Sequence, residues 1–376
     1  MRSTAILKGT ENEYYRATYK SMGFSSDDMK DRPLIGIANA WSECVPGHYN
    51  LRQVAEKVKA GIYRAGGTPV EFGVMGGCDG IAQGQIGMHY ILPSRELIAS
   101  SVESMAQINL FDGLVLLGSC DKIVPGMLMA AARLDIPCIL LPGGPMEGGC
   151  EFDGHQADQS SLTEAYGMLS SGRMTEEAYA AMEDTACPSC GSCAYLGTAN
   201  TMCSLSEAMG MTIPTGATTP ATSGRRMALA QETGVRIVEL VRKGISARKI
   251  ITNESIRNAI KVCLAMAGST NAVMHLTAIA HEAELSIDVV KEFDELSRVT
   301  PQIAKIFPAS HKYNMIDFYR DGAVPRVMKE LGDRLDTSVL TVTGETLEKT
   351  LAAHRYLYPL TNNVIHPVSD PFGYTG

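Results

Sequence analysis

The chain has 376 residues, of which 45% are hydrophobic and 20% charged, and its formal net charge is −8. This is the composition of a globular protein with room for two domains, or for one large domain with an extension. It excludes nucleic acid as an expected partner, because phosphate binding needs concentrated Lys and Arg and no such cluster occurs. No apolar run is long enough for a bilayer and no apolar signal core opens the chain, so we expect no membrane partner and a cytoplasmic location.

The first 145 residues alternate between strand-like and helix-like patterns. Short apolar runs predict buried strands, and amphipathic segments between them predict helices. We expect strands at 33–39, 68–74, 113–117 and 136–141, and helices at 51–65, 94–108 and 125–134. Strands separated by helices predict a parallel α/β sheet covered by helices on both faces, in three layers. Ligands of such sheets bind beyond the carboxyl ends of the strands.

The pattern changes after residue 145. Residues 146–360 are dominated by helical periodicity, as in 225–242 and 271–284, and we expect them to continue the same unit. Residues 361–376 are rich in Pro, Gly and other helix breakers. We expect this last segment to be a truncated linker to an absent further domain.

Three cysteines lie within seven residues, in the run Cys187-x-x-Cys190-x-x-Cys193. Cytosolic thiols stay reduced, so such a run predicts a metal site sooner than a disulfide. Thiolates bind iron–sulfur clusters, zinc or cuprous copper, and a bacterial ferredoxin run begins with this spacing. Zinc usually needs a second Cys or His pair, which is absent. The alternative is a set of core cysteines on a turn; we expect the isolated Cys138 and Cys263 to be buried packing residues.

Two further loops follow predicted strands. One contains Cys78 and Asp79, and the other contains Cys120-Asp121-Lys122. A thiolate suits iron and a carboxylate suits magnesium or manganese, so the second loop could hold two metals side by side. Lys122 would then either bind a substrate carboxylate or be carbamylated to give an anionic oxygen ligand. The alternative is an ordinary helix start, with Asp121 as its cap and a proline in the first turn.

Taken together, these stretches resemble the dihydroxy-acid dehydratase and phosphogluconate dehydratase family. The similarity runs from the N-terminus to the final residues. Two stretches, Val-Pro-Gly-His at 45–48 and Leu-Pro-Ser-Arg-Glu at 92–96, are most like the dihydroxy-acid dehydratase branch. The other matching stretches are 78–82, 120–126, 143–146, 186–193, 198–202 and 268–271.

The resemblance implies a role for five of these residues. Cys120 and Cys193 match ligands of the family's iron–sulfur cluster, whereas Cys187 and Cys190 are not clearly ligands. The family's magnesium ligands correspond to the residues Asp79, Asp121 and Lys122, the last as its carbamate.

The third cluster cysteine is left open by the resemblance. Many family members carry it in a Pro-Cys-Asn step, which here reads Pro46-Gly47-His48, so Cys44 and Cys78 are the two candidates. The glycine form resembles members with an oxygen-sensitive 4Fe–4S cluster rather than a 2Fe–2S cluster. We consider two roles for His48: contact with the substrate or a cluster sulfur, or a purely structural one.

The implied activity is that of a hydro-lyase: removal of water from a 2,3-dihydroxy carboxylic acid to give a 2-oxo acid. The substrate of the most similar branch is 2,3-dihydroxy-3-methylbutanoate, which yields 3-methyl-2-oxobutanoate in branched-chain amino-acid biosynthesis. The iron would take the C3 hydroxyl, and magnesium would acidify the C2 proton. The resemblance also implies a barrel-like C-terminal domain that carries the base and is missing here. We expect a homodimer.

Two alternatives remain. One is a sugar-acid dehydratase that acts on an aldonate or on phosphogluconate. An enzyme that recognises a phosphate group would need extra Arg or Lys near the motifs. No such cluster is evident, which favours the smaller 2,3-dihydroxy-3-methylbutanoate. The other alternative is a non-catalytic iron–sulfur or zinc-binding protein.

Overall fold

The computed structural model describes residues 1–376 and is built around a parallel sheet. Its strands are β1 (Leu34–Asn39), β2 (Thr68–Gly73), β3 (Gly113–Leu117) and β4 (Cys138–Leu141), in the order β2-β1-β3-β4. All three pairings are parallel, and β1, β3 and β4 are buried along their whole length. This confirms the predicted sheet and the positions of its four strands.

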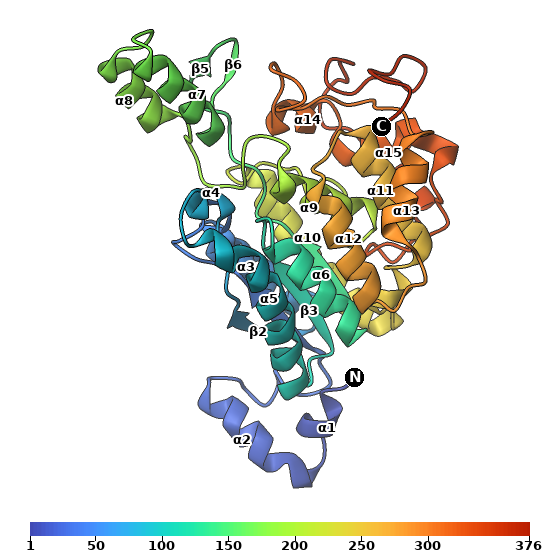
Figure 1. The fold of residues 1–376 in the computed structure, drawn as a ribbon. Helices are drawn as coiled ribbons and strands as arrows, with labels where there is room; N and C mark the ends of the chain where they lie inside the picture. Colours follow the sequence, from blue (N-terminus) through green and yellow to red (C-terminus); the bar gives the residue numbers. More distant parts are fainter.

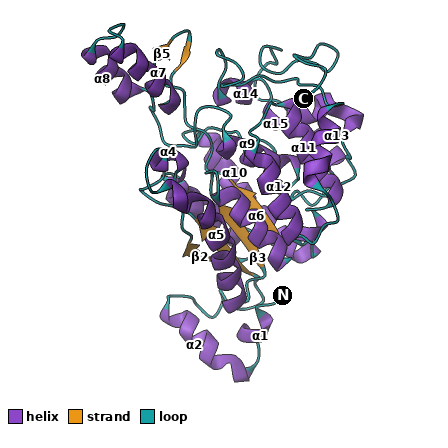
Figure 2. Ribbon diagram, viewed as in Figure 1, coloured by secondary structure: helices purple, strands orange, loops and turns teal.

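Helices cover both faces of the sheet, as the alternating pattern predicts (Figure 2). On one face, α3 (Leu51–Arg64) packs against α10 (Gly224–Lys243); on the other, α5 (Met88–Ile108) packs against α6 (Ile123–Leu134). The helix expected at 94–108 begins earlier, at Met88, so Pro93 lies inside α5. One proline near a helix start removes a single backbone hydrogen bond, which the packed helix tolerates.

The crossing of α3 and α10 depends on two glycines. A Cβ on Gly61 would lie 2.1 Å from the carbonyl oxygen of Gln231, and a Cβ on Gly234 would lie 2.1 Å from that of Val58. Both distances are too short for any side chain. The absence of side chains at these two positions therefore allows the helix backbones to meet directly.

The order of the strands creates a crevice at one edge of the sheet. The chain leaves β1 for β2 on one side and returns to β3 on the other side of β1. Such a reversal opens a crevice beyond the carboxyl ends of the two central strands, where ligands of α/β sheets bind. Here those ends are joined by the bond from Ala40 N–H to the carbonyl oxygen of Leu117, at 3.0 Å.

The rest of the chain is mostly helical and shares the core of the sheet. One cluster of 87 buried residues extends from Leu7 to Ile365. The remaining helices of this body are α1 (Thr4–Leu7), α2 (Glu13–Ser21), α4 (Asp79–Ala82), α9 (Thr198–Ala208), α11 (Asn253–Ala265), α12 (Asn271–Glu282), α13 (Val289–Ser297), α14 (Met315–Arg320), α15 (Ala323–Leu331) and α16 (Leu347–Ala353). Short 3₁₀ turns occur at η1 (Thr10–Asn12), η2 (Pro46–His48), η3 (Ala247–Lys249) and η4 (Gly332–Arg334). None of the helices combines the length and apolar character that a bilayer crossing requires.

The segment expected to be a linker packs against this body. Val364 and Ile365 are buried, and their N–H groups donate to the Asp321 carboxylate at 3.0 and 2.9 Å. The Gly376 N–H donates to the carbonyl oxygen of Ser297 at 2.9 Å. Residues 361–376 therefore belong to the folded unit, because apolar burial and a buried carboxylate hold them in place.

A small unit stands off the body, and we call it the satellite (Figure 1). It comprises β5 (Glu151–Phe152), β6 (His155–Gln156), α7 (Gln159–Ser170) and α8 (Glu176–Thr185). It has a core of its own, made of Phe152, Ala157, Ala165, Met182 and Ala186. With so few buried residues, the satellite should open more easily than the main body.

Candidate active site

The three loops singled out in the sequence meet at one pocket of about 420 Å³. The pocket lies beyond the carboxyl ends of the strands, and α4, α7 and α9 each contribute residues to its lining. Among its lining residues are Cys78, Asp79, Cys120, Asp121 and Cys193. Four of the predicted ligands are thus together, and Lys122 reaches the same place through an ion pair with Asp79.

The cysteines of the pocket are buried or partly buried and lie close to other acidic groups. Cys120 is 6% exposed. Burial raises the pKa of Cys120 well above its usual value, and the nearby Cys78 and Cys193 add to the effect. Burial, followed by the charge of Asp121, raises the pKa of Cys193 to about 12. Without a cation these thiols stay protonated, whereas a bound metal would favour their thiolate forms.

Of the two candidates for a third cysteine ligand, only Cys78 lines the pocket. Cys44 is exposed and lies outside the pocket lining. Position 47, where many family members have their cysteine, does lie at the site: a Cβ on Gly47 would stand 2.8 Å from the Cys120 sulfur. The glycine brings no thiol, so Cys78 is the remaining neighbour of Cys120 and Cys193.

The run Cys187, Cys190 and Cys193 does not form one three-thiol site, so that interpretation is wrong. Cys187 is exposed, Cys190 is partly buried, and neither lines the pocket. The loop turns at Gly191, where φ is +139°, and Ser192 N–H donates to the carbonyl oxygen of Gly144 at 2.9 Å. These contacts bring Cys193 inward and leave the two earlier cysteines outside.

The carboxylates of Asp79 and Asp121 line the same pocket as the thiols. Asp79 begins α4; one of its oxygens pairs with Lys122, and the other, Oδ1, is buried without a hydrogen-bond partner. Burial, followed by the charge of Asp79, raises the pKa of Asp121 to about 6. Lys122, not Asp121, is the residue before α6, and it forms no side-chain cap there. The capping interpretation of Asp121 is therefore wrong.

As placed, no three His, Cys, Asp or Glu side chains are close enough to hold a metal ion. The chemistry of the donors nevertheless fits two different groups. The lining combines soft sulfurs with hard carboxylate oxygens, which suit an iron–sulfur cluster and magnesium respectively. The unpartnered Asp79 Oδ1 and the raised pKa of Asp121 are what a missing cation would leave behind. The residues therefore fit the expected cofactors.

Of the two roles considered for His48, contact with the ligands or a structural role, its surroundings support the structural one. It is fully buried in η2, and its Nε2 accepts the N–H groups of Ser119 at 3.0 Å and Cys120 at 3.4 Å. Burial lowers the pKa of His48 to about 4, so the ring is neutral at physiological pH and its Nε2 can accept. His48 thus holds the loop that carries Cys120 and does not line the pocket.

Other lining residues lie outside the stretches that match the family, among them Gln159, Glu164 and Tyr195. Two of them come from α7 of the satellite, and the amide Nε2 of Gln159 donates to the Cys193 sulfur at 3.2 Å. Only the position of α7 reveals these contacts, because nothing in its sequence distinguishes Gln159 from a surface glutamine.

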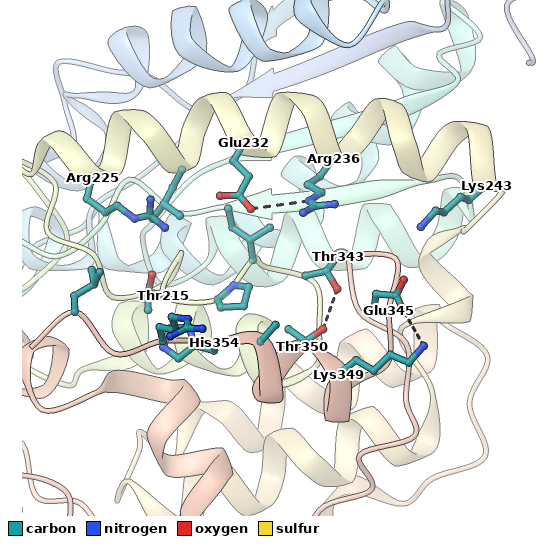
Figure 3. A pocket seen from close by; sticks show the side chains of 16 residues that line it. Thr215, Arg225, Glu232, Arg236, Lys243, Thr343, Glu345, Lys349, Thr350 and His354 are labelled. Carbon is teal, nitrogen blue, oxygen red and sulfur yellow. Dashed lines mark hydrogen bonds and ion pairs between the residues drawn. The ribbon is translucent and has the colours of Figure 1, made fainter. Parts of the chain in front are cut away.

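A second cavity, of about 520 Å³, runs between α10 and α16 (Figure 3). We call it the charged groove. Its walls carry charged side chains such as Arg225, Glu232, Lys243, Glu345 and Lys349, and no cysteine. It lacks the mixed thiol and carboxylate set of the first pocket.

Comparison with known proteins agrees with this site. The family model for the N-terminal part of dihydroxy-acid/6-phosphogluconate dehydratases matches residues 32–350. A dihydroxy-acid dehydratase of Pyrococcus furiosus is 48% identical over 99% of this chain and 67% of its own length. Those of Caldanaerobacter subterraneus and Moorella thermoacetica are 47% and 46% identical over 100% of this chain and 67% of theirs. The chain thus spans about two thirds of the length of these relatives, and it belongs to the dihydroxy-acid/6-phosphogluconate dehydratase family.

Proposed function

We propose that this chain carries the cofactor site of a hydro-lyase that converts a 2,3-dihydroxy carboxylic acid into a 2-oxo acid. We take its substrate to be 2,3-dihydroxy-3-methylbutanoate, a member of the dihydroxy acids for which its relatives are named. The observation that carries the proposal is that Cys120, Cys193, Asp79 and Asp121 line one pocket. A single small substrate can reach both kinds of ligand there.

In this proposal Cys78, Cys120 and Cys193 hold an iron–sulfur cluster. Three protein thiols suit a 4Fe–4S cluster with one iron free, better than a 2Fe–2S cluster. Asp79, Asp121 and Lys122 hold Mg²⁺, with Lys122 as its carbamate. When bound, these cofactors supply Lewis acids for the leaving hydroxyl and for the substrate carboxylate.

The residues of the chain prepare this site in two ways. Carbamylation of Lys122 by CO₂ would replace a cation with an anionic oxygen and release the Asp79 oxygen that Lys122 now occupies. The adjacency of Cys120 and Asp121 in one loop holds the two sets of ligands side by side. This spacing suits a reaction at two neighbouring carbons of one substrate.

The composition of the pocket favours an unphosphorylated substrate. None of its 16 lining residues is Arg or Lys, whereas Asp79, Asp121 and Glu164 are acidic. A phosphate group in these walls would meet negative charge and no bidentate donor. Phosphogluconate is therefore the poorer candidate for the part of the site that this chain supplies.

An anaerobic assay tests the proposal. We expect the reconstituted chain to bind iron and sulfide and, with Mg²⁺ present, to bind 2,3-dihydroxy-3-methylbutanoate, with the Pyrococcus furiosus relative as the positive control for binding and for turnover. Gluconate and 6-phosphogluconate are the competing substrates. Tighter binding of either would favour a sugar-acid dehydratase, and a chain that holds a cluster but binds none of these acids would favour a non-catalytic protein.

We also propose that the protein works in the cytoplasm as a homodimer, without nucleic acid. All ten cysteines are free thiols, which suits a reducing compartment. Light scattering of the purified chain tests the dimer, and a monomer at micromolar concentration would contradict it.

A further inference from the structure

Gln159 connects the satellite to the sulfur of a proposed cluster ligand. Its side-chain amide donates to the Cys193 sulfur at 3.2 Å. The same amide nitrogen would stand 3.3 Å from a Cβ on Gly80, and that Cβ would be 3.7 Å from the Cys78 sulfur. Gln159 therefore lies close to two of the three proposed thiol ligands.

The start of α7 holds Gln159 in this position. Gln159 is the first residue of the helix, and the preceding Asp158 caps it by accepting the N–H groups of Ser160 at 2.6 Å and Ser161 at 3.2 Å. The Ser161 hydroxyl accepts the Asp158 N–H in return at 3.2 Å. Asp158 and Ser161 are both buried. A capping box of this kind fixes the backbone from which the glutamine side chain extends.

A hydrogen bond to a ligand sulfur has a defined electrostatic effect. The donor stabilises negative charge on the sulfur, so it favours the more reduced state of a bound cluster and raises its reduction potential. Nothing else about the pocket requires a glutamine here: the satellite core is built from other residues, and Gln159 is not among them. The amide points out of the satellite toward the thiols.

We propose that Gln159 is a positioning residue of the cluster site, which sets the potential and the air stability of the cluster through its bond to Cys193. The inference rests on the proposed function, because it requires a cluster on Cys193. It also means that the satellite contributes to the cofactor environment, although its core is separate from that of the main body.

The test compares Gln159→Leu with wild type after anaerobic reconstitution. Leucine keeps the bulk of the side chain and removes the donor. We expect a lower midpoint potential in an EPR-monitored titration. In air, we expect the visible absorbance of the cluster to decay about two- to tenfold faster, the change expected when the free energy of one ordinary hydrogen bond is lost from the barrier to oxidation. Gln159→Glu should shift both readouts further, because it places a charged acceptor beside the thiolate.

Gln83→Leu is the matched control, since Gln83 lines the same pocket without a hydrogen bond to sulfur. It should leave the potential and the decay rate at their wild-type values. Far-UV circular dichroism checks that each variant is folded, and Gln159→Glu covers the case in which leucine unfolds α7. Wild-type potential and decay in a folded Gln159 variant would overturn this inference while the proposed function stands. A wild-type chain that binds no iron and sulfide would overturn the proposed cluster, and this inference with it.

Discussion

The pocket beside the thiols and the charged groove differ in how their ionisable groups are balanced. In the groove, Glu345 pairs with Lys349 at 3.1 Å, and Glu232 lies 3.9 Å from Arg236, all on exposed or half-exposed side chains. In the pocket, burial and like charge raise the pKa of Asp121 to about 6 and that of Cys193 to about 12. The groove is the larger cavity, at 520 against 420 Å³. Ionisable groups with raised pKa values, more than the volume of the cavity, therefore identify the candidate site.

Removal of a thiol from the pocket should have the largest effect. We expect Cys78→Ser, Cys120→Ser and Cys193→Ser each to lose most of the iron and sulfide, because serine is a poor ligand for these clusters. Cys187→Ser is the control from the same loop as Cys193, and it should keep both. If Cys44→Ser loses iron while Cys78→Ser retains it, the third ligand has been misassigned.

Removal of a carboxylate should weaken the second metal site. Asp79→Asn and Asp121→Asn should each reduce Mn²⁺ affinity, measured by EPR as a probe for Mg²⁺, by more than about tenfold, since even second-shell changes cost that much. Glu164→Gln is the matched control, because this acid lines the same pocket outside the proposed ligand set. Equal losses in all three variants would point to general electrostatics and against a defined site.

Asp121 should make the metal-free protein less stable at neutral pH. Its pKa is about 6 in the folded chain and 3.8 in the reference state, so the folded state holds the proton more tightly. Stability should therefore fall as pH rises between these values. We expect metal-free Asp121→Asn to exceed wild type by roughly 1–3 kcal/mol at pH 7, and to match it near pH 4, in urea unfolding.

Saturating Mg²⁺ should remove or reverse this advantage, because the ion binds the wild-type carboxylate and stabilises the folded state. A variant that is less stable than wild type at both pH values without metal would show that the charge of Asp121 does not destabilise the metal-free protein.

A substitution in the groove should have the smallest effect. Glu345→Gln breaks the ion pair with Lys349, and exposed pairs of this kind contribute little to stability. We expect unchanged iron content, Mn²⁺ affinity and unfolding midpoint. A clear loss in any of these would show that the groove matters and that the contrast between the two cavities is misplaced.

Sequence reasoning succeeded where one local pattern determines the outcome. The run at 113–117 is short, apolar and bounded by breakers, and it forms β3 as predicted. Because parallel strands end at the same edge of a sheet, the loops with Asp79 and Cys120 had to lie at one edge, on either side of β1. The resemblance added Cys193, whose loop lies far along the chain from both.

Sequence reasoning failed where the direction of a side chain determines whether a residue reaches the site. The choice between Cys44 and Cys78 depends on how the loop after β1 turns: this loop buries His48 and leaves Cys44 in solvent. The spacing of Cys187 and Cys193 suggests one shared site, but the turn at Gly191 separates them. Gln159 reaches Cys193 across 34 residues of sequence, and a contact at that separation leaves no periodic signal.

The glycine contact between α3 and α10 also limits how this protein can be recombined. Gly61 and Gly234 lie on opposite sides of residue 145, where the sequence pattern suggests a boundary. A chimera with a relative joined at that point would inherit one half of a backbone-to-backbone contact from each parent. If either parent carried a larger residue at position 61 or 234, its side chain would push α3 and α10 apart. Viable crossovers should therefore either exchange both helices together or match the glycines in both parents.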